Sequence, residues 1–370
     1  MAIDQQTLLY QIALTLLPGV GDVNARKLVS YTGSPEAVFT EKKANLLRIP
    51  GMGSFTADLI IQNRDVLKRA AEEVEFVDKF KIEPVFYTSD GYPERLKHCA
   101  DSPVLIYKSG NADLNSPRIV SIVGTRRATE YGKEICRKLV SGLVEMDVLV
   151  ISGLAYGIDT CAHKSALDEG LSTVGVLAHG LDRIYPPLNK GLAERMVNQG
   201  GLVTEFPSQT NPDRENFPKR NRIIAGLADA TIVIEAGAKG GALITADIAN
   251  SYNRDVFAVP GRIGDPASEG CNNLIKTNRA ALVQSANDIR YIMGWDKLNA
   301  KATPAQTRLF VQLDADQENV VRILTENGDC GLDKICNCSG VQTSKVAAAL
   351  LSLEFEGIVK SLPGKIYRLI

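Results

Sequence analysis

Residues 118–159 read RIVSIVGTRRATEYGKEICRKLVSGLVEMDVLVISGLAYGID, and this β-α-β pattern is the strongest indication of the fold. An apolar, β-branched run precedes a helical pattern, and a second apolar run follows. The alternation continues to residue 294. It predicts strands at 119–123, 148–151, 173–177, 202–204, 231–234, 256–259 and 281–283, with helices at 131–145, 156–169, 188–198, 222–228, 243–252 and 286–293. Such a pattern favours an α/β protein with an extended, Rossmann-like, doubly wound parallel sheet and a ligand site at the carboxyl ends of the strands.

The loop after the first predicted strand has the composition of a phosphate-binding turn. Gly124, Thr125, Arg126 and Arg127 stand just before a predicted helix. They therefore place a tight turn, a hydroxyl and two guanidinium groups at a helix N-terminus, which suits an anion. The next glycine is Gly132, so the spacing of the dinucleotide fingerprint is absent. The alternative is that the two arginines form surface ion pairs.

The second predicted strand also ends in a small polar turn, Ser152 and Gly153. Asp159 follows, where it could cap or anchor the loop, and His163 lies four residues further along the same predicted helix. This spacing is compatible with a metal site or an acid–base pair. An ordinary contact on one helix face is the favoured interpretation.

The densest basic cluster spans residues 213–222, DRENFPKRNR, at the start of a predicted helix. Lys219, Arg220 and Asn221 in this cluster suit contacts with a nucleic-acid backbone. Phe217 either stacks on a base or packs against the start of the helix, and both interpretations stay open. Two acidic residues offset part of the charge, so a solvated helix start is the alternative.

A glycine-rich turn, EAGAKGGALITA at 235–246, follows another predicted strand. Gly240, Gly241 and Thr245 stand at the start of a helix, where they are compatible with a phosphate, although the Walker A spacing is absent. No loop pairs carboxylates for hydrolysis, and no nucleophile–histidine–acid set is evident. We therefore expect no catalysis, no cofactor and no metal site.

Two different helical modules flank the predicted sheet domain of residues 76–295. Residues 1–75 contain two similar turns, LPGVG and IPGMG, each before a helical pattern, which is typical of a helix-hairpin-helix (SAM-like) domain. Whether this domain contacts DNA or only packs its own helices stays open. Residues 296–317 are polar and predict a linker. Residues 318–370 predict three helices and a terminal hairpin, which is a winged helix.

The composition is that of an ordinary globular protein, with 370 residues of which 45% are hydrophobic and 23% charged. The net charge is −1, so a nucleic-acid site must depend on local clusters. Seven cysteines suggest a reducing compartment, and Cys330, Cys336 and Cys338 are interpreted as packing residues of the winged helix. The N-terminus lacks the features of a signal peptide, and no apolar run has the length of a membrane span. We expect a cytoplasmic protein.

Six ordered motifs between residues 119 and 294 resemble the DNA-processing protein A family, also called DprA or Smf. These motifs are VGTRRAT, SGLAYGID, ENFPKRNRII, EAGAKGGALITA, NRDVFAVPG and GCNNLI. The flanking helix-hairpin-helix and winged-helix segments are common accessories of the same family. The resemblance implies a Rossmann-type domain that binds single-stranded DNA in a basic pocket and forms a homodimer. It also implies a recombination mediator that protects incoming DNA and loads the RecA recombinase during natural transformation, without catalysis.

The resemblance also assigns site residues by motif. The residues implied to grip phosphates are Gly124, Thr125 and Arg126, with Lys219 and Arg220 opposite. The glycines of Ser152-Gly153 and Gly240-Gly241 are implied to let the strand approach closely. Thr125 stands where many relatives have serine, and it keeps the hydroxyl. The turn at 237–239, Gly-Ala-Lys, departs from the serine-rich turn of the family.

Two other classes of function fit less well. Phosphoribohydrolases on a similar domain carry a PGGxGTxxE loop with a catalytic glutamate, and residues 240–247 have neither that spacing nor the glutamate. A duplex-reading transcription factor would use its winged helix, but residues 316–370 hold six Lys or Arg against seven Asp or Glu. A neutral module is a poor duplex reader, because phosphate neutralisation supplies most of the affinity. Protein docking or weak DNA contact fits this module better.

Overall fold

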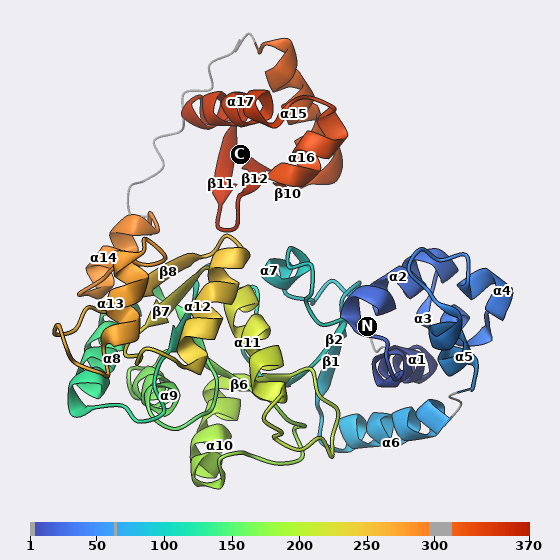
Figure 1. Cartoon of the computed structure of the whole chain (residues 1–370), viewed down its shortest axis with the longest axis horizontal. Coiled ribbons are helices and arrows are strands. Elements are labelled where there is room, and N and C mark those ends of the chain that lie inside the picture. Colours follow the sequence, from blue (N-terminus) through green and yellow to red (C-terminus); the bar gives the residue numbers. More distant parts are fainter. Residues whose placement is uncertain (1–3, 63–64, 296–312) are drawn as a thin grey trace.

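The computed structural model describes residues 4–62, 65–295 and 313–370. Nine strands form one sheet in the order β1-β2-β6-β5-β4-β3-β7-β8-β9 (Figure 1). Their bounds are β1 Glu83–Phe86, β2 Leu105–Gly110, β3 Ile119–Val123, β4 Leu149–Ser152, β5 Thr173–Val176, β6 Gly200–Thr204, β7 Ala230–Val233, β8 Asp255–Ala258 and β9 Ala281–Leu282. The seven strands from β6 to β9 in this order are parallel. The predicted doubly wound sheet is confirmed, and β1 and β2 extend it with an antiparallel edge that the alternation did not predict.

Helices cover both faces of the sheet because successive side chains of each strand point to opposite faces. In β3, Val120 and Ile122 pack with the helices of one face, whereas Ile119 and Val123 pack with those of the other. The first face carries α8 Glu130–Leu143, α9 Ile158–Asp168 and α14 Ala286–Ile292. The second carries α7 Glu94–Lys97, α11 Asn216–Leu227, α12 Gly241–Ser251 and α13 Glu269–Lys276. Helix α10, Lys190–Gln199, packs beside β6.

The chain reverses its direction across the sheet at β3. It runs outward from β3 through β4 and β5 to β6, and it then returns to β7 on the other side of β3. The loops that follow β3 and β7 therefore lead to helices on opposite faces. Such a switch point opens a crevice at the carboxyl ends of the strands, and ligands of doubly wound proteins bind there.

Within residues 4–62 and 65–79, six helices form the N-terminal domain, with bounds α1 Gln5–Leu16, α2 Asp22–Thr32, α3 Pro35–Thr40, α4 Lys43–Leu46, α5 Ser54–Gln62 and α6 Asp65–Lys79. Both predicted hairpin turns are present, and Gly19 and Gly51 adopt φ angles of +74° and +84°, which side chains disfavour. Helix α6 crosses the predicted domain boundary at residue 75. The apolar core of these helices also continues onto the sheet through Leu105 and Tyr107 of β2.

The first of the two hairpins packs against the sheet domain. The Asp22 carboxylate, at the start of α2, accepts a hydrogen bond from the Val104 amide at 2.8 Å and lies 3.1 Å from the Arg222 guanidinium of α11. Arg26, one turn later, donates to the carbonyl oxygen of Ala100 at 3.0 Å. The start of α2, directly after the first hairpin turn, is therefore engaged in contacts within the chain.

The C-terminal module is a winged helix, as predicted. Its elements are α15 Ala315–Asn327, β10 Cys330–Gly331, α16 Leu332–Ser339, α17 Thr343–Phe355, β11 Val359–Leu362 and β12 Ile366–Leu369. Most of the predicted linker of residues 296–317 lies outside the described residues, and α15 begins inside its last part. Of the three cysteines interpreted as packing residues, Cys330 is buried and Cys336 half-buried. The interpretation is wrong for Cys338, which is exposed because it lies on the outer side of α16.

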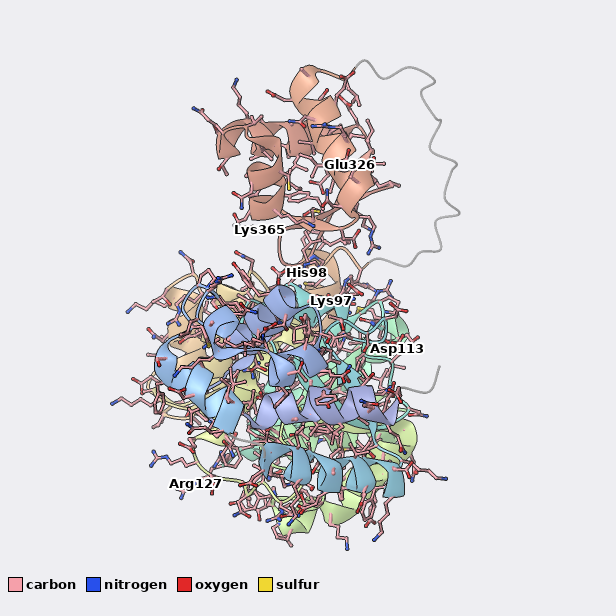
Figure 2. The ribbon with its side chains drawn as sticks, turned by 90° about the vertical axis from the view of Figure 1, so that its right-hand side faces the viewer. Lys97, His98, Asp113, Arg127, Glu326 and Lys365 are labelled. Carbon is pink, nitrogen blue, oxygen red and sulfur yellow. The ribbon has the colours of Figure 1, made fainter. Side chains whose placement is uncertain are left out.

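The hairpin of the winged helix touches the sheet domain. The buried Arg254, just before β8, donates a hydrogen bond to the carbonyl oxygen of Pro363 in the hairpin turn at 3.0 Å. Figure 2 shows this turn, marked by Lys365, on the side of the sheet domain that carries Lys97 and His98. Because Arg254 precedes its strand, this contact lies at the amino ends of the parallel strands. It is therefore at the opposite edge from the expected ligand crevice. Within the described ranges, no helix is both long and apolar enough to cross a membrane.

Candidate nucleic-acid interface

A cavity of about 640 Å³ opens at the carboxyl ends of β3 and β7, where the chain reverses across the sheet. Its walls come from the loops after β3, β4 and β7 and from the start of α11. Nine of the residues predicted for the site line it, and they are Gly124, Thr125, Arg126, Phe217, Arg220, Asn221, Gly240, Gly241 and Thr245. The predicted residues are thus brought together from three separate segments of the sequence.

The loop of Arg126 is held in place by Glu235 at the end of β7. The Thr125 amide donates to the Glu235 carbonyl oxygen at 2.7 Å. The Glu235 carboxylate accepts hydrogen bonds from the Thr129 hydroxyl at 2.6 Å and from the Thr129 amide at 2.9 Å. A Cβ atom on Gly124 would lie 2.5 Å from the Ile158 side chain, so only glycine fits there. The loop is therefore positioned before any ligand arrives.

The Arg126 guanidinium lies over the ring of Phe217, with its Cζ 5.1 Å from the ring centroid. Phe217 also faces Tyr185, and the two ring centroids are 6.2 Å apart. An arginine and two aromatic rings on one wall give both an anion contact and a stacking surface. Arg127, the next residue, is exposed and does not line the cavity, and Figure 2 shows it at the outer edge of the molecule.

Arg220 and Asp159 are two buried, oppositely charged side chains in the lining of the cavity. Burial lowers the pKa of Arg220 to about 10, against the opposing effect of Asp159, so the guanidinium stays charged at neutral pH. Burial also raises the pKa of Asp159, while Arg220 lowers it. The Arg220 Nη1 donates to the carbonyl oxygen of Val176 at 2.5 Å. The Arg220 side chain is therefore held within the protein, and it adds positive charge to the cavity without being free to move toward a ligand.

The turn of Ser152 and Gly153 packs against the Arg220 and Asp159 side chains and does not line the cavity. The Ser152 hydroxyl is buried and donates to the carbonyl oxygen of Ile122 at 2.5 Å. A Cβ atom on Gly153 would overlap Arg220 Nη1 and would lie 2.5 Å from the Asp159 carboxylate. The glycine is therefore needed for close packing inside the protein. The expectation of close approach by a ligand at this turn is wrong.

His163 belongs to the same buried region. Its ring nitrogens make hydrogen bonds with the Thr173 hydroxyl at 2.7 Å and with the Gly153 carbonyl oxygen at 2.5 Å. Burial lowers the pKa of His163 to about 4. Neither of these bonds involves Asp159, so the acid–base pair that the spacing allowed is not formed. Among the described residues, no group of three histidine, cysteine or carboxylate side chains is arranged to hold a metal ion.

Lys219 lies outside the cavity, which corrects the expectation that it faces Arg126. It lines a second cavity of about 510 Å³ on the other side of α11, beside Glu205. The reason is helical periodicity, because residues three and four apart share one face of a helix. The residues of α11 that line the first cavity lie on one face of the helix, and they are Phe217, Pro218, Arg220, Asn221 and Ile224.

Two further basic residues line the first cavity, Arg214 and Lys239. Arg214 stands three residues before Phe217 in the predicted basic cluster, and Lys239 stands in the predicted glycine-rich turn. Both are exposed. Because each stands close in sequence to a residue predicted for the site, Phe217 or Gly240, the sequence could have indicated that they line the same cavity.

The N-terminus of α12 completes the cavity. A Cβ atom on Gly240 or Gly241 would meet no atom within 4 Å, so these glycines leave open space. The Thr245 hydroxyl and the Asn221 amide both donate to the Gly241 carbonyl oxygen, at 3.1 and 3.4 Å. An open helix start with free amides attracts an anion.

The charge of the cavity is positive and uncompensated. Arg126, Arg214 and Lys239 all line it, and in the part of the chain that the structure describes none of them forms an ion pair. The lining includes one carboxylate, Asp159, and the charge of the neighbouring Arg220 lowers its pKa while burial raises it. The arrangement suits a ligand with several negative charges and a flat, apolar part.

Models of three protein families match successive parts of the chain. "DNA recombination-mediator protein A" matches residues 83–294, "DprA winged helix domain" matches residues 300–365, and "SAM-like Helix-hairpin-helix tandem" matches residues 12–63. A protein named Smf from Synechocystis sp. is 33% identical over 97% of this chain and 98% of its own length.

Two solved structures are also similar. The X-ray structure of DNA processing protein A from Streptococcus pneumoniae is 34% identical and has a TM-score of 0.66, over 79% of this chain and 98% of its own. A structure of DNA processing protein A from Helicobacter pylori, described for its unique single-stranded DNA binding mode, is 27% identical with a TM-score of 0.53. The match covers 59% of this chain and 97% of that one. The fold, the order of the domains and these matches agree, and the chain belongs to the DNA processing protein A family of recombination mediators.

Proposed function

We propose that this chain binds single-stranded DNA in the cavity at the carboxyl ends of β3 and β7. The observation that carries the proposal is the combination of three unpaired cations, Arg126, Arg214 and Lys239, with the aromatic ring of Phe217 under the Arg126 guanidinium. The family relative from Helicobacter pylori, described for a single-stranded DNA binding mode, supports the same ligand.

In this proposal the cations and the start of α12 bind phosphates, and the aromatic wall binds a base. Phosphate contacts position a strand without reading its sequence. Phe217 and Tyr185 offer faces on which an unpaired base can stack, and stacking contributes about 1–3 kcal/mol per base. The bases of a duplex are already stacked on their neighbours and do not offer such faces. A preference for single strands with little sequence selectivity follows.

We further propose that the protein acts as a recombination mediator that protects incoming DNA and loads the RecA recombinase in the cytoplasm during natural transformation. Such a role requires binding and release, and it requires no chemical change in the DNA. The loops that line the cavity offer no nucleophile next to a base. The chain would then leave both DNA and nucleotides intact.

A homodimer is part of the same proposal. The candidate surface is the region from Gly261 to Val283, at the edge of the sheet. Ile263 there is fully exposed and Leu282, in the edge strand β9, is half-exposed, which is unusual for two large apolar side chains in one region. An unpaired edge strand is also a natural place for a second copy to pack. Light scattering tests this, and a monomer at tens of micromolar would contradict it.

One titration tests the proposed ligand. Purified protein is added to labelled single-stranded and double-stranded oligonucleotides of the same sequence at several salt concentrations. We expect tighter binding to the single strand and an affinity that falls as salt rises, because cations that bind phosphates release counterions. Equal affinity for both forms, or binding that ignores salt, would contradict the proposal. Gel analysis of the same samples after incubation would reveal any cleavage.

A further inference from the structure

Two cysteine side chains meet where α8 packs on α9, on the opposite face of the sheet from α11. Cys136 of α8 is fully buried, and Cys161 near the start of α9 is partly buried. Both belong to one packed cluster. The Cys161 Sγ lies 3.5 Å from the carbonyl oxygen of Lys133, one turn before Cys136 on α8. Neither thiol lines the proposed DNA cavity, so the proposed function gives them no role.

The surroundings of Cys161 favour its thiolate form. It is the fourth residue of α9, close to the positive end of the helix dipole. A hydrogen bond with the Cys136 thiol lowers the pKa of Cys161, and partial burial opposes this effect. A hydrogen bond with Ser165 and the positive charges of Arg137 and Lys133 lower it further. Reactive thiols occur in such electropositive, partly exposed places.

Cys136 has the complementary environment. Its hydrogen bond with Cys161 and its burial raise its pKa, and the nearby charge of Asp159 adds to that effect. The raised pKa of Cys136 favours its protonated thiol form. A thiolate nucleophile next to a buried, protonated thiol is the arrangement of an attacking and a resolving cysteine.

We propose that Cys161 and Cys136 form a peroxide-reactive pair that closes to an intramolecular disulfide between α8 and α9. The Cys161 thiolate attacks one oxygen of a hydroperoxide and the O–O bond breaks. The sulfur loses two electrons and becomes a sulfenic acid, and the departing oxygen takes a proton from water. The Cys136 sulfur then attacks the sulfenic sulfur. The S–O bond breaks, the hydroxyl leaves as water with the Cys136 proton, and the disulfide forms.

The pair lies behind one wall of the DNA cavity. Helix α8 follows the loop of Arg126, and α9 follows the loop after β4. These two loops already touch, because the Ile158 amide donates to the Thr125 carbonyl oxygen at 3.2 Å. A Cβ atom on Gly157 would overlap that oxygen. A disulfide that draws α9 toward α8 therefore displaces the loop of Arg126 and weakens binding of a single strand, a consequence that rests on the proposed function.

The full, reduced chain tests the pair directly. It is treated with stoichiometric hydrogen peroxide, its remaining thiols are alkylated, and its peptides are mapped by mass spectrometry. We expect the peptides of Cys136 and Cys161 to be joined, while the exposed Cys338 is still alkylated. Oxidation of Cys338 first, or over-oxidation of Cys161 with no joined peptide, would overturn the proposal. Because this readout uses no DNA, it stands even if the reduced protein fails to bind single strands. If the reduced protein binds and the oxidised protein binds equally well, the link to the DNA site is wrong.

Three variants test the proposed roles of Cys136 and Cys161 one at a time. Cys136→Ser keeps a hydrogen-bond donor, so Cys161 should still react and should stop at a sulfenic acid that dimedone traps. Cys136→Ala removes the donor, so alkylation of Cys161 should need a higher pH. Equal pH profiles for these two variants would show that the hydrogen bond does not activate Cys161. Cys161→Ser should form no disulfide, and because this side chain is partly exposed the variant should keep the wild-type melting temperature.

Discussion

Helix α11 separates two cavities of similar size and different electrostatic character. The cavity on the Arg126 side contains cations that have no acidic partner. On the other side, Arg222 forms ion pairs with both Asp22 of the helix-hairpin-helix domain and Glu205 after β6. Cations that acidic groups already neutralise bind domains to one another, whereas cations left without partners are available to a phosphate. The basic cluster of residues 213–222 thus supplies residues both to the proposed ligand site and to the contact between the two domains.

The largest expected effect concerns the packing of Gly153 against Arg220, behind the first cavity. Gly153→Ala should destabilise the protein by about 1–3 kcal/mol, because the added methyl group overlaps the buried Arg220 side chain. Thermal unfolding measures this loss. Gly240→Ala is the matched control on the open side of the same cavity, where a methyl group meets no atom within 4 Å. Equal stability of the two variants would mean that the Arg220 side chain is not tightly packed.

Arg126→Ala should weaken single-strand binding by about tenfold, or ~1.4 kcal/mol. It removes a phosphate contact and the cation over Phe217, so the log–log salt slope should flatten by roughly 0.7 as well. Arg126→Lys keeps the charge but loses the planar fork, and it should recover part of the loss. Arg127→Ala is the matched control, since this neighbour does not line the cavity. Wild-type binding and slope in Arg126→Ala would rule out this cavity as the DNA site.

The stability of the contact that Arg222 makes with Asp22 and Glu205, between the helix-hairpin-helix and sheet domains, should depend on pH. Burial raises the pKa of Glu205 to about 7 from its ordinary 4.5, with Asp22 adding to the shift and Arg222 opposing it. The folded protein then keeps a proton that the unfolded chain releases in this window. The stability from this proton is complete below about pH 4.5 and is lost as pH rises through about 7. Urea unfolding across this range measures the loss. Glu205→Gln should show a flatter profile, and an unchanged profile would contradict the assignment to Glu205.

The smallest expected effect on single-strand binding is that of a change at Lys219, on the other side of α11. Lys219→Ala should leave single-strand affinity and the salt slope close to wild type, because Lys219 lies in the second cavity. The same change should raise the pKa of Glu205 further, since the charge of Lys219 lowers it. A loss of affinity as large as that of Arg126→Ala would mean that the bound strand passes over α11 and contacts both sides.

Much of the fold could be predicted because it depends on local patterns. The β-branched runs of β3 to β9 and the intervening helical patterns are readable within short windows. The edge strands β1 and β2 were missed, since β1 begins Glu-Pro and neither strand belongs to a β-α-β alternation. Helix α13 was missed for a similar reason, as its eight residues carry only a short periodic signal.

The candidate site was predicted in part. The turns after strand ends and the basic cluster at the start of α11 identified nine of the lining residues, because a parallel sheet gathers such loops at one edge. The sequence did not show that Arg214 lines the first cavity whereas Lys219 lines the second, because both belong to one run of charged residues. It also did not distinguish Gly153, which makes room for Arg220, from Gly240, which leaves space open. Both are glycines in turns after strands.

The sequence by itself determined the kind of protein: a doubly wound sheet, two flanking helical modules, and basic loops that a sheet edge must bring together. Only the tertiary structure decided which cations are free. Side-chain direction on α11 depends on where the helix begins and on what packs against each face. A charge is available to a ligand only if no carboxylate from a distant segment reaches it, as Asp22 and Glu205 reach Arg222. Such long-range pairing is a property of the packed chain, because residues 200 positions apart meet only when the domains dock.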